Sequence, residues 1–193
     1  MDKSDYPKEV EIERAVPDDA EIICDIRDRA WLKAYPNAEL GITADDIRVN
    51  AQGRDGEFVP RRIAHLKKQF TQDDGSGLTT FVAKVEGKVV GYVEPIIDEQ
   101  NKRYISAIYV DPNNQRGGVG TQLYEKAVEL LGEDQDIFLE VVSYNQNAIE
   151  FYKKRGFEQT EAIVPEDEGR PDYMKSLPMI EMVLKAKTDH TSL

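Results

Sequence analysis

The sequence predicts a mixed α/β domain in which helices flank one central sheet. Two observations on apolar residues support this prediction: they alternate in several short segments, as in half-buried strands, and recur at helical spacing in others. A third observation is the order of the central segments, which is strand, strand, strand, helix, strand, helix, strand, strand. That order implies one βαβ crossover in the middle, with antiparallel strands around it.

The N-terminal part is expected to contain one strand followed by helices. Apolar residues alternate at first and then recur at near-helical spacing as far as Trp31. The segment PNAELG breaks this helix, because proline, asparagine and glycine favour turns. The expected elements, in order, are a strand over residues 10 to 16, a helix opened by Pro17 and Asp18, two helical pieces within 43 to 72, and a loop over 73 to 77.

The C-terminal part is expected to supply the rest of the sheet and two further helices. Short apolar segments separated by turn residues are typical of strands, and glycine is typical just after a helix. The expected elements are a β-hairpin of 79 to 85 and 89 to 97 with Gly87 in its turn, a strand over 103 to 110, a helix from about Val119 to Gly132, a strand over 137 to 142, a helix over 147 to 155 closed by Gly156, strands over 157 to 164 and 179 to 185, and a frayed tail over 186 to 193.

Composition and charge limit the function classes. The 193 residues suffice for a single domain, 1 to 193, and no apolar stretch is long enough for a transmembrane helix. The formal charge of −12 argues against a nucleic-acid partner, which needs a basic surface, and we expect no membrane partner. The charged N-terminus and the single cysteine, Cys24, lead us to expect a cytoplasmic location.

The segment RGGVG, residues 116 to 120, places three glycines where a helix begins. Glycine in a helix costs about 1 kcal/mol per residue relative to alanine, so the chain gives up helix stability for bare backbone. The first N–H groups of a helix lack internal partners and favour an anion, and glycine lets that anion approach. We therefore expect a phosphate-binding cradle at this junction, with Arg116 adding positive charge.

Three kinds of phosphate site use such a loop. A nucleotide-hydrolase loop needs Lys-Ser or Lys-Thr after its glycines, and neither follows here. A dinucleotide-binding loop needs a third glycine where this sequence has Leu123, so that interpretation is weak. The third kind is a site for the diphosphate of coenzyme A.

Two motifs in order resemble the signatures of the GCN5-related N-acetyltransferase (GNAT) superfamily. QRGGVG, residues 115 to 120, is similar to the family's Gln/Arg-x-x-Gly-x-Gly/Ala loop, and the preceding AIYVDPNNQ resembles its fourth strand and turn. NQNAIEFYKKRGF, residues 145 to 157, resembles the family's Asn-x-x-Ala-x-x-x-Tyr-x-x-x-Gly-Phe motif. The matched core covers roughly residues 79 to 160, and AWLKAYP, residues 30 to 36, resembles the corresponding family stretch less specifically.

The resemblance implies a twisted, mostly antiparallel mixed sheet of six to seven strands. A β-bulge and splay between the fourth and fifth strands would admit acetyl-coenzyme A as acyl donor, with no metal. Strand backbone would hold the pantetheine arm, and the cradle amides the diphosphate. Asn145 would bond a pantetheine amide, although a cap role fits it too, and Asn147 is expected to be a helix cap. The implied cofactor-binding residues are Ile108, Tyr109, Val110, Gln115, Arg116, Gly117, Gly118, Val119, Gly120, Thr121, Asn145 and Tyr152.

The resemblance also implies an N-acetyltransferase that acts by direct transfer in a ternary complex. The acceptor would be a primary amine of a small molecule or of a protein. Tyr152 is the candidate general acid for the departing thiolate; helical tyrosines are usually core aromatics, and its position in the motif favours the acid role. Glu94, a polar residue late in an apolar strand, is the first candidate for the general base and Tyr104 the second; an exposed edge position explains Glu94 as well.

The helical segment of residues 17 to 76 is expected to form the acceptor side. Trp31 and Tyr35 lie one helical turn apart and are candidate substrate-binding residues, and packing of the helix onto the sheet explains them equally well. Two other functions stay open: a non-catalytic acyl-coenzyme A-binding regulatory module, and a protein N-acetyltransferase that works within a complex and docks through residues 36 to 78. A homodimer is a further option, because dimers are common in the family.

Overall fold

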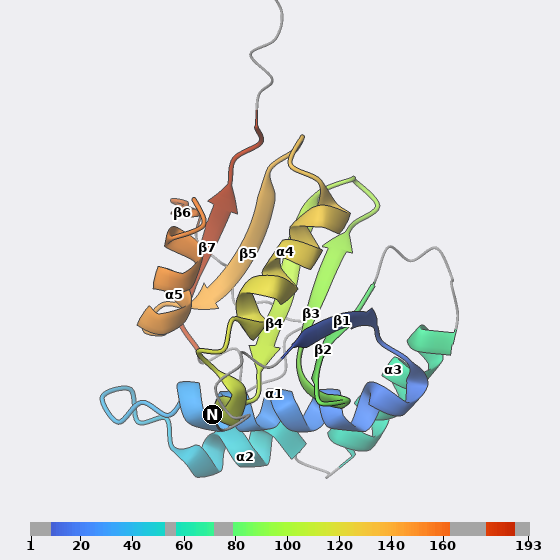
Figure 1. Cartoon of the computed structure of the whole chain (residues 1–193). Helices are drawn as coiled ribbons and strands as arrows, with labels where there is room; N and C mark the ends of the chain where they lie inside the picture. Colours follow the sequence, from blue (N-terminus) through green and yellow to red (C-terminus); the bar gives the residue numbers. More distant parts are fainter. Residues whose placement is uncertain (1–8, 53–56, 72–78, 163–176, 188–193) are drawn as a thin grey trace, which may run out of the picture.

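A computed structural model describes residues 9–52, 57–71, 79–162 and 177–187 (Figure 1). Its centre is a seven-stranded sheet in the order β1-β2-β3-β4-β5-β7-β6. All neighbouring strands pair antiparallel except β4 and β5, which pair parallel. The strands are β1 Val10–Arg14, β2 Phe81–Val85, β3 Lys88–Ile97, β4 Arg103–Val110, β5 Ile137–Val142, β6 Glu158–Gln159 and β7 Met179–Leu184.

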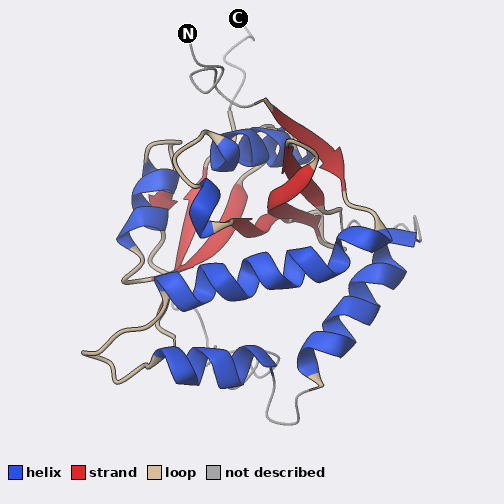
Figure 2. Ribbon diagram, turned by 60° about the horizontal axis from the view of Figure 1, so that its bottom comes forward, coloured by secondary structure: helices blue, strands red, loops and turns tan. Residues whose placement is uncertain are grey.

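Helices cover both faces of the sheet. Helix α4 lies across one face in Figure 1, with α5 beside β7. Figure 2 shows α1 running between the sheet and α2, with α3 at its end. The helices are α1 Ala20–Ala34, α2 Ala44–Gln52, α3 Phe58–Thr71, α4 Val119–Leu131 and α5 Gln146–Lys153, with short 3-10 turns η1 Pro17–Asp19 and η2 Pro112–Asn114.

Two main apolar clusters hold the layers together. On the α4 side, Leu123 and Ala127 pack with Val93, Ile105 and Leu139 of the sheet. On the α1 side, a second cluster joins α1 and α3 to the opposite faces of the same strands. The alternation of side chains along a strand explains this division, because successive residues point to opposite faces. The sheet therefore has a separate apolar core on each face.

Strands β4 and β5 separate soon after they meet. In the described structure they pair only at Arg103 with Ile137 and at Tyr104 with Phe138. The rest of β4 pairs on its other side with β3 as far as Val110. The predicted splay between the fourth and fifth strands is therefore confirmed, while the register shifts lie between β2 and β3 and between β3 and β4.

Most predicted elements are present, with shifted ends. The hairpin turn is as expected, since Glu86 and Gly87 both have positive φ, 53° and 74°. The strand predicted over 157 to 164 is wrong in length. Only Glu158–Gln159 pair with β7, and residues 163 and 164 lie outside the described residues, as does most of the predicted tail. This short strand has exposed side chains and closes the sheet at its edge.

Candidate functional site

A large cavity lies where β4 and β5 separate. Its volume is about 790 Å³. Residues 105 to 110 of β4 form one wall, and β5 and the start of α5 form the opposite wall. The loop before α4 and the C-terminal end of α1 complete the lining. Segments far apart in the sequence thus converge on one gap in the sheet.

The glycine-rich loop presents bare amides at this cavity. Arg116 and Gly118 have left-handed backbone, with φ of 71° and 82°. Thr121 and Gln122 donate their N–H groups to the carbonyl of Gly118, at 3.0 and 3.1 Å. The amides before them, of Val119 and Gly120, therefore begin the helix with no bond to a described backbone carbonyl. This end of α4 is suited to hold an anion.

None of the three glycines is required by the packing of the described residues, since a Cβ at Gly118 would meet nothing within 4 Å. A Cβ at Gly117 would meet nothing closer than the Asn114 carbonyl at 3.8 Å. A Cβ at Gly120 would make only ordinary contacts, with Phe151 at 3.6 Å and Val110 at 3.7 Å. Only Gly118 needs its positive φ. The bare backbone at Gly120, which lines the cavity, therefore leaves room for something other than protein.

Basic side chains gather around the loop, although the chain as a whole carries a formal charge of −12. Lys33 and Arg116 line the cavity, and Lys33 Nζ lies 3.4 Å from Gln115 Oε1. Arg155 donates to Thr121 Oγ1 at 2.7 Å and lies over the ring of Phe151, 3.5 Å from its centroid. Arg155 was not predicted from the sequence, because only the packing of α5 on the loop brings it there.

One edge of β4 is left without a strand partner along the cavity. Ile108, Tyr109 and Val110 pair with β3 on one side and line the cavity on the other. On that side β5 pairs only with residues 103 and 104, and the Val110 carbonyl accepts a hydrogen bond from the Gln115 side chain at 3.4 Å. An extended ligand in this gap can bond to the β4 backbone as an added strand would.

Tyr152 lies at this cavity on the buried side of α5. Its side chain is buried among Phe151 and Phe157, with ring centroids 5.2 and 5.6 Å away, and it also lines the cavity. Burial raises the pKa of Tyr152 well above that of an ordinary tyrosine, and the nearby Tyr109 adds to the shift. Like that of an ordinary tyrosine, the phenol is protonated at neutral pH and can donate a hydrogen bond, and the raised pKa makes it a weaker acid.

Asn145, and not Asn147, is the cap of α5. The Asn145 side-chain oxygen accepts from the amide of Ala148 at 3.3 Å. Asn147 lies inside the helix instead, so the expected cap role of that residue is wrong. Asn145 also lines the cavity, and the nitrogen of its side-chain amide takes no part in the cap.

Three tyrosines form the wall on the α1 side. The hydroxyls of Tyr35 and Tyr109 lie 3.4 Å apart, and the hydroxyl of Tyr144 donates to the Tyr35 carbonyl at 2.8 Å. All three line the cavity. Trp31 is not among the lining residues; it packs behind them, with its ring centroid 5.7 Å from that of Tyr35 and 6.3 Å from that of Tyr109. Of the two predicted substrate-binding residues, Tyr35 lines the cavity, and Trp31 packs behind it.

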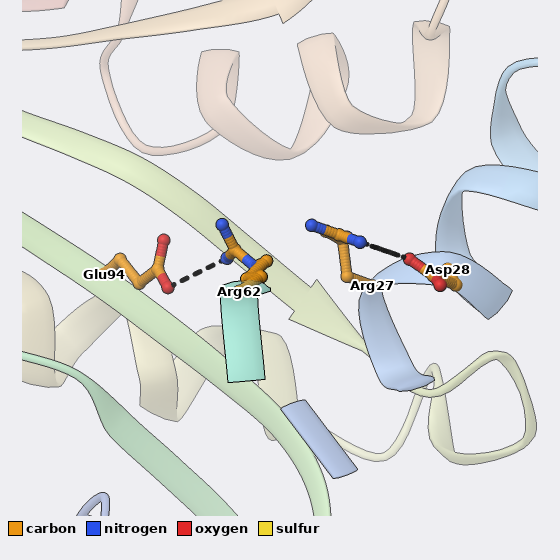
Figure 3. A network of polar contacts seen from close by, with 4 residues as sticks. All are labelled: Arg27, Asp28, Arg62 and Glu94. Atoms are coloured by element: carbon orange, nitrogen blue, oxygen red, sulfur yellow. Dashed lines mark hydrogen bonds and ion pairs between the residues drawn. The ribbon is translucent and has the colours of Figure 1, made fainter. Parts of the chain in front are cut away.

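Glu94 lies outside this cavity. Its carboxylate is 3.3 Å from the guanidinium of Arg62, and both residues line a separate cavity of about 160 Å³ between α3 and β3. Figure 3 shows Arg62 between Glu94 and Arg27, which itself bonds Asp28 at 2.7 Å. Burial raises the pKa of Glu94, although Arg62, Arg27 and His65 act in the opposite direction. The Glu94 carboxylate therefore pairs with Arg62 in this smaller cavity and not in the gap between β4 and β5.

Tyr104 lies at the closed end of the gap, where β4 still pairs with β5. Its ring contacts Phe138 of β5, with centroids 6.0 Å apart, and Lys102 lies over it at 4.8 Å. Tyr104 is not among the residues that line the large cavity. The structure does not bring this candidate base to the site.

Glu140 is a candidate that the sequence analysis did not consider. It is the only acidic side chain among the described residues that line the large cavity. It is exposed, and its neighbours Leu139 and Val141 are buried toward the α4 side, so Glu140 faces the α1 side. The signal was present in the sequence, since Glu140 interrupts an apolar strand just as Glu94 does.

No metal centre or membrane span is found among the described residues. They contain no group of three or more histidine, cysteine, aspartate or glutamate side chains placed to hold a metal ion. No helix in the described ranges is long and apolar enough to cross a membrane.

Comparison with known proteins places these features in a family. A model of the Acetyltransferase (GNAT) family matches residues 45–157. An uncharacterized N-acetyltransferase of Methanocaldococcus jannaschii is 37% identical over 91 residues, which cover 43% of this chain and 40% of that protein. An N-alpha-acetyltransferase of Sulfurisphaera tokodaii is 33% identical over 97 residues, which cover 43% of this chain and 58% of the relative. The chain thus matches only about half the length of these curated relatives.

Solved structures match over almost the whole chain. The PaiA N-acetyltransferase of Thermoplasma acidophilum, in complex with coenzyme A, aligns with a TM-score of 0.68 at 17% identity and covers 92% of this chain and 99% of its own. A putative acetyltransferase of Salmonella typhimurium with acetyl-CoA aligns with a TM-score of 0.63 at 18% identity, covering 95% of this chain and 96% of its own. At these identities the likeness concerns the fold.

Proposed function

Because the chain belongs to the acetyltransferase (GNAT) family, we propose that it transfers an acetyl group from acetyl-coenzyme A to a primary amine. The observation that carries the proposal is the cavity between β4 and β5, which joins an anion-binding helix end to an unpaired strand edge. A long ligand with a diphosphate at one end and amide groups along its arm matches both features. Coenzyme A is such a ligand.

The residues present fit this donor. The amides of Val119 and Gly120 would hold the diphosphate, with Arg116 and Lys33 supplying charge. The free edge of β4 would bond the pantetheine amides. This placement brings the thioester toward Tyr152, which lines the same cavity.

Tyr152 is proposed to act on the leaving group. The amine nitrogen attacks the thioester carbonyl, a C–N bond forms, and the C–S bond breaks to release a thiolate. The phenol of Tyr152, which lines the cavity, would donate a hydrogen bond or a proton to that sulfur as negative charge develops on it.

Glu140 is proposed to handle the proton of the amine. An ammonium group must lose a proton before its lone pair can attack, and Glu140 is the one carboxylate among the described residues that line the cavity. Glu94 is the weaker candidate, because it lines the other cavity, between α3 and β3. A proton from the amine would pass to Glu140 directly or through a water molecule.

The acceptor is proposed to enter on the α1 side, along Tyr35, Tyr109 and Tyr144. Two kinds of acceptor fit a wall of tyrosine rings: a small amine, and the amine of a protein. The name of one relative favours a protein, since the relative from Sulfurisphaera tokodaii is an N-alpha-acetyltransferase. Docking within a complex, a homodimer and a cytoplasmic location stay predictions.

A non-catalytic acyl-coenzyme A-binding module is the other candidate. A pure binder has no use for a buried, protonated phenol beside the gap or for a carboxylate facing it. Tyr152 and Glu140 therefore favour the enzyme.

The test is thiol release from acetyl-coenzyme A with a panel of acceptors. The panel contains peptides with free N-termini, lysine peptides and small primary amines. Turnover is expected with at least one acceptor, and Tyr152→Phe is expected to lower kcat about 100-fold while the protein still binds coenzyme A. Binding without turnover on every acceptor would favour the regulatory module, and wild-type turnover by Tyr152→Phe at all pH values would remove the acid role.

A further inference from the structure

Helix α1 is attached to the loop that leads into the glycine-rich cradle. The guanidinium of Arg29 donates twice to Asp111 Oδ2, from Nε at 3.0 Å and from an Nη at 2.7 Å. One helical turn later, Lys33 Nζ contacts Gln115 Oε1 at 3.4 Å. Residues 82 positions apart in the sequence are thus joined at two points along the same side of α1.

Asp111 fixes the direction in which the chain leaves β4. Its amide donates to the carbonyl of Val90 at 2.8 Å, which extends the pairing of β4 with β3. Its Oδ1 accepts from the amide of Asn113 at 2.9 Å and so caps the turn η2. The chain then enters the left-handed conformation of Arg116 and reaches the cradle. The orientation of one carboxylate therefore helps to set where the cradle begins.

The Arg29 contact is more than a pair on the open surface. The side chain of Asp111 is only 14% exposed, whereas that of Arg29 is 41% exposed. Burial alone would raise the pKa of Asp111, but the hydrogen bonds from Asn113 and Arg29 outweigh it and hold the pKa below its ordinary value. A half-buried carboxylate with defined partners on both oxygens has little freedom to turn.

We propose that Arg29 is a positioning residue for the cofactor, which holds Asp111 and through it the cradle. This inference rests on the proposed function, since it concerns the affinity for coenzyme A. Arg29 itself is not among the residues that line the cavity. Its effect on the ligand therefore passes through Asp111 and the turn η2. Without Arg29 the loop samples other orientations, and binding must first select the competent one.

The experiment measures the binding of coenzyme A by calorimetry in a double-mutant cycle. Arg29→Ala is expected to weaken binding about tenfold, as the loss of a charged hydrogen bond would. Asp111→Asn, which keeps a capping oxygen but removes the charge, is expected to weaken it similarly. Because both act through one contact, the double variant should be about as weak as either single variant.

Three further measurements separate positioning from loss of fold. Arg29→Lys should recover part of the affinity, since it restores the charge with one donor group. Arg48→Ala removes an arginine from the Arg48–Asp45 pair on α2, away from the cavity, and should bind as the wild type does. In turnover assays, Arg29→Ala should raise KM for acetyl-coenzyme A and leave kcat nearly unchanged.

The outcomes distinguish this inference from the proposal that it rests on. If the wild type does not bind coenzyme A, the proposed function fails and this inference with it. If the wild type binds and Arg29→Ala binds equally well, only the inference fails. Fully additive losses in the double variant would also overturn it, because they would show that Arg29 attracts the ligand directly.

Discussion

At the scale of single residues, the surroundings of two glutamates decide which of them is the better candidate for the general base. Glu94 and Glu140 each stand in an otherwise apolar strand, and the sequence offers no way to rank them. The structure separates them, because Glu94 pairs with Arg62 in one cavity and Glu140 faces the gap between β4 and β5. The side to which a strand residue points depends on register and bulges. The β3–β4 register shifts between Glu94 and Pro95.

The first prediction at this scale compares the two glutamates. Glu140→Gln is expected to lower kcat about 100-fold or more, because it removes the proposed general base. Glu94→Gln, its matched control, is expected to change kcat only a few-fold, because that carboxylate lies in the other cavity. Initial rates at saturating acetyl-coenzyme A provide the measurement. The opposite ranking would return the role of base to Glu94.

The positions of other residues at the cavity were predictable, because they depend on local sequence. Tyr152 follows from its position in the second motif, and the cradle follows from glycines at the start of a helix. Asn145 and Asn147 were confused, since both are good cap residues two positions apart and the helix begins one residue earlier than expected. Arg155 was missed because its contact with Thr121 spans 34 positions in the sequence.

At the scale of elements, the strands and helices follow closely from periodicity. The hairpin of β2 and β3, the strand β4 and the helix α4 begin and end within a few residues of their predicted bounds. The strand predicted after Gly156 was overestimated, because the alternation of FEQTEAIV continues beyond the two residues that pair with β7. Pairing depends on a partner strand, and sequence periodicity cannot show where that partner ends.

The start of α4 supports a prediction with opposite effects on stability and binding. Gly120→Ala should raise the free energy of unfolding by about 0.5–1 kcal/mol, because alanine favours the helix and its Cβ meets only ordinary contacts. The same methyl group should weaken coenzyme A binding, since Gly120 lines the cavity. Urea denaturation and calorimetry measure the two effects. An unchanged affinity would mean that no ligand approaches this residue.

Gly118→Ala is the matched control for this prediction. Its φ of 82° is unfavourable for alanine, so the variant should lose about 1–2 kcal/mol of stability. A gain in stability at Gly118 would contradict the left-handed backbone described for the loop.

At the scale of the whole molecule, the chain order predicts the sheet but not how the helices brace it. The mixed sheet and its crossover follow from the sequence of strands and helices. The contact of α1 with the cradle loop does not, because it joins charged residues on two elements whose relative placement depends on packing. The same packing gathers basic side chains at one cavity of an otherwise acidic protein.

The most direct test compares the binding of coenzyme A with that of pantetheine, which lacks the diphosphate and the 3′-phosphoadenosine attached to it. The comparison is repeated with Gly120→Ala, in which the difference in affinity should shrink if the start of α4 holds the diphosphate. The central claim is that bare amides at the start of α4 hold that diphosphate. Calorimetry should therefore detect coenzyme A binding that is at least about tenfold tighter than that of pantetheine, as expected from losing charge-assisted hydrogen bonds. Equal affinities for the two ligands, or no heat of binding with coenzyme A, would contradict the claim.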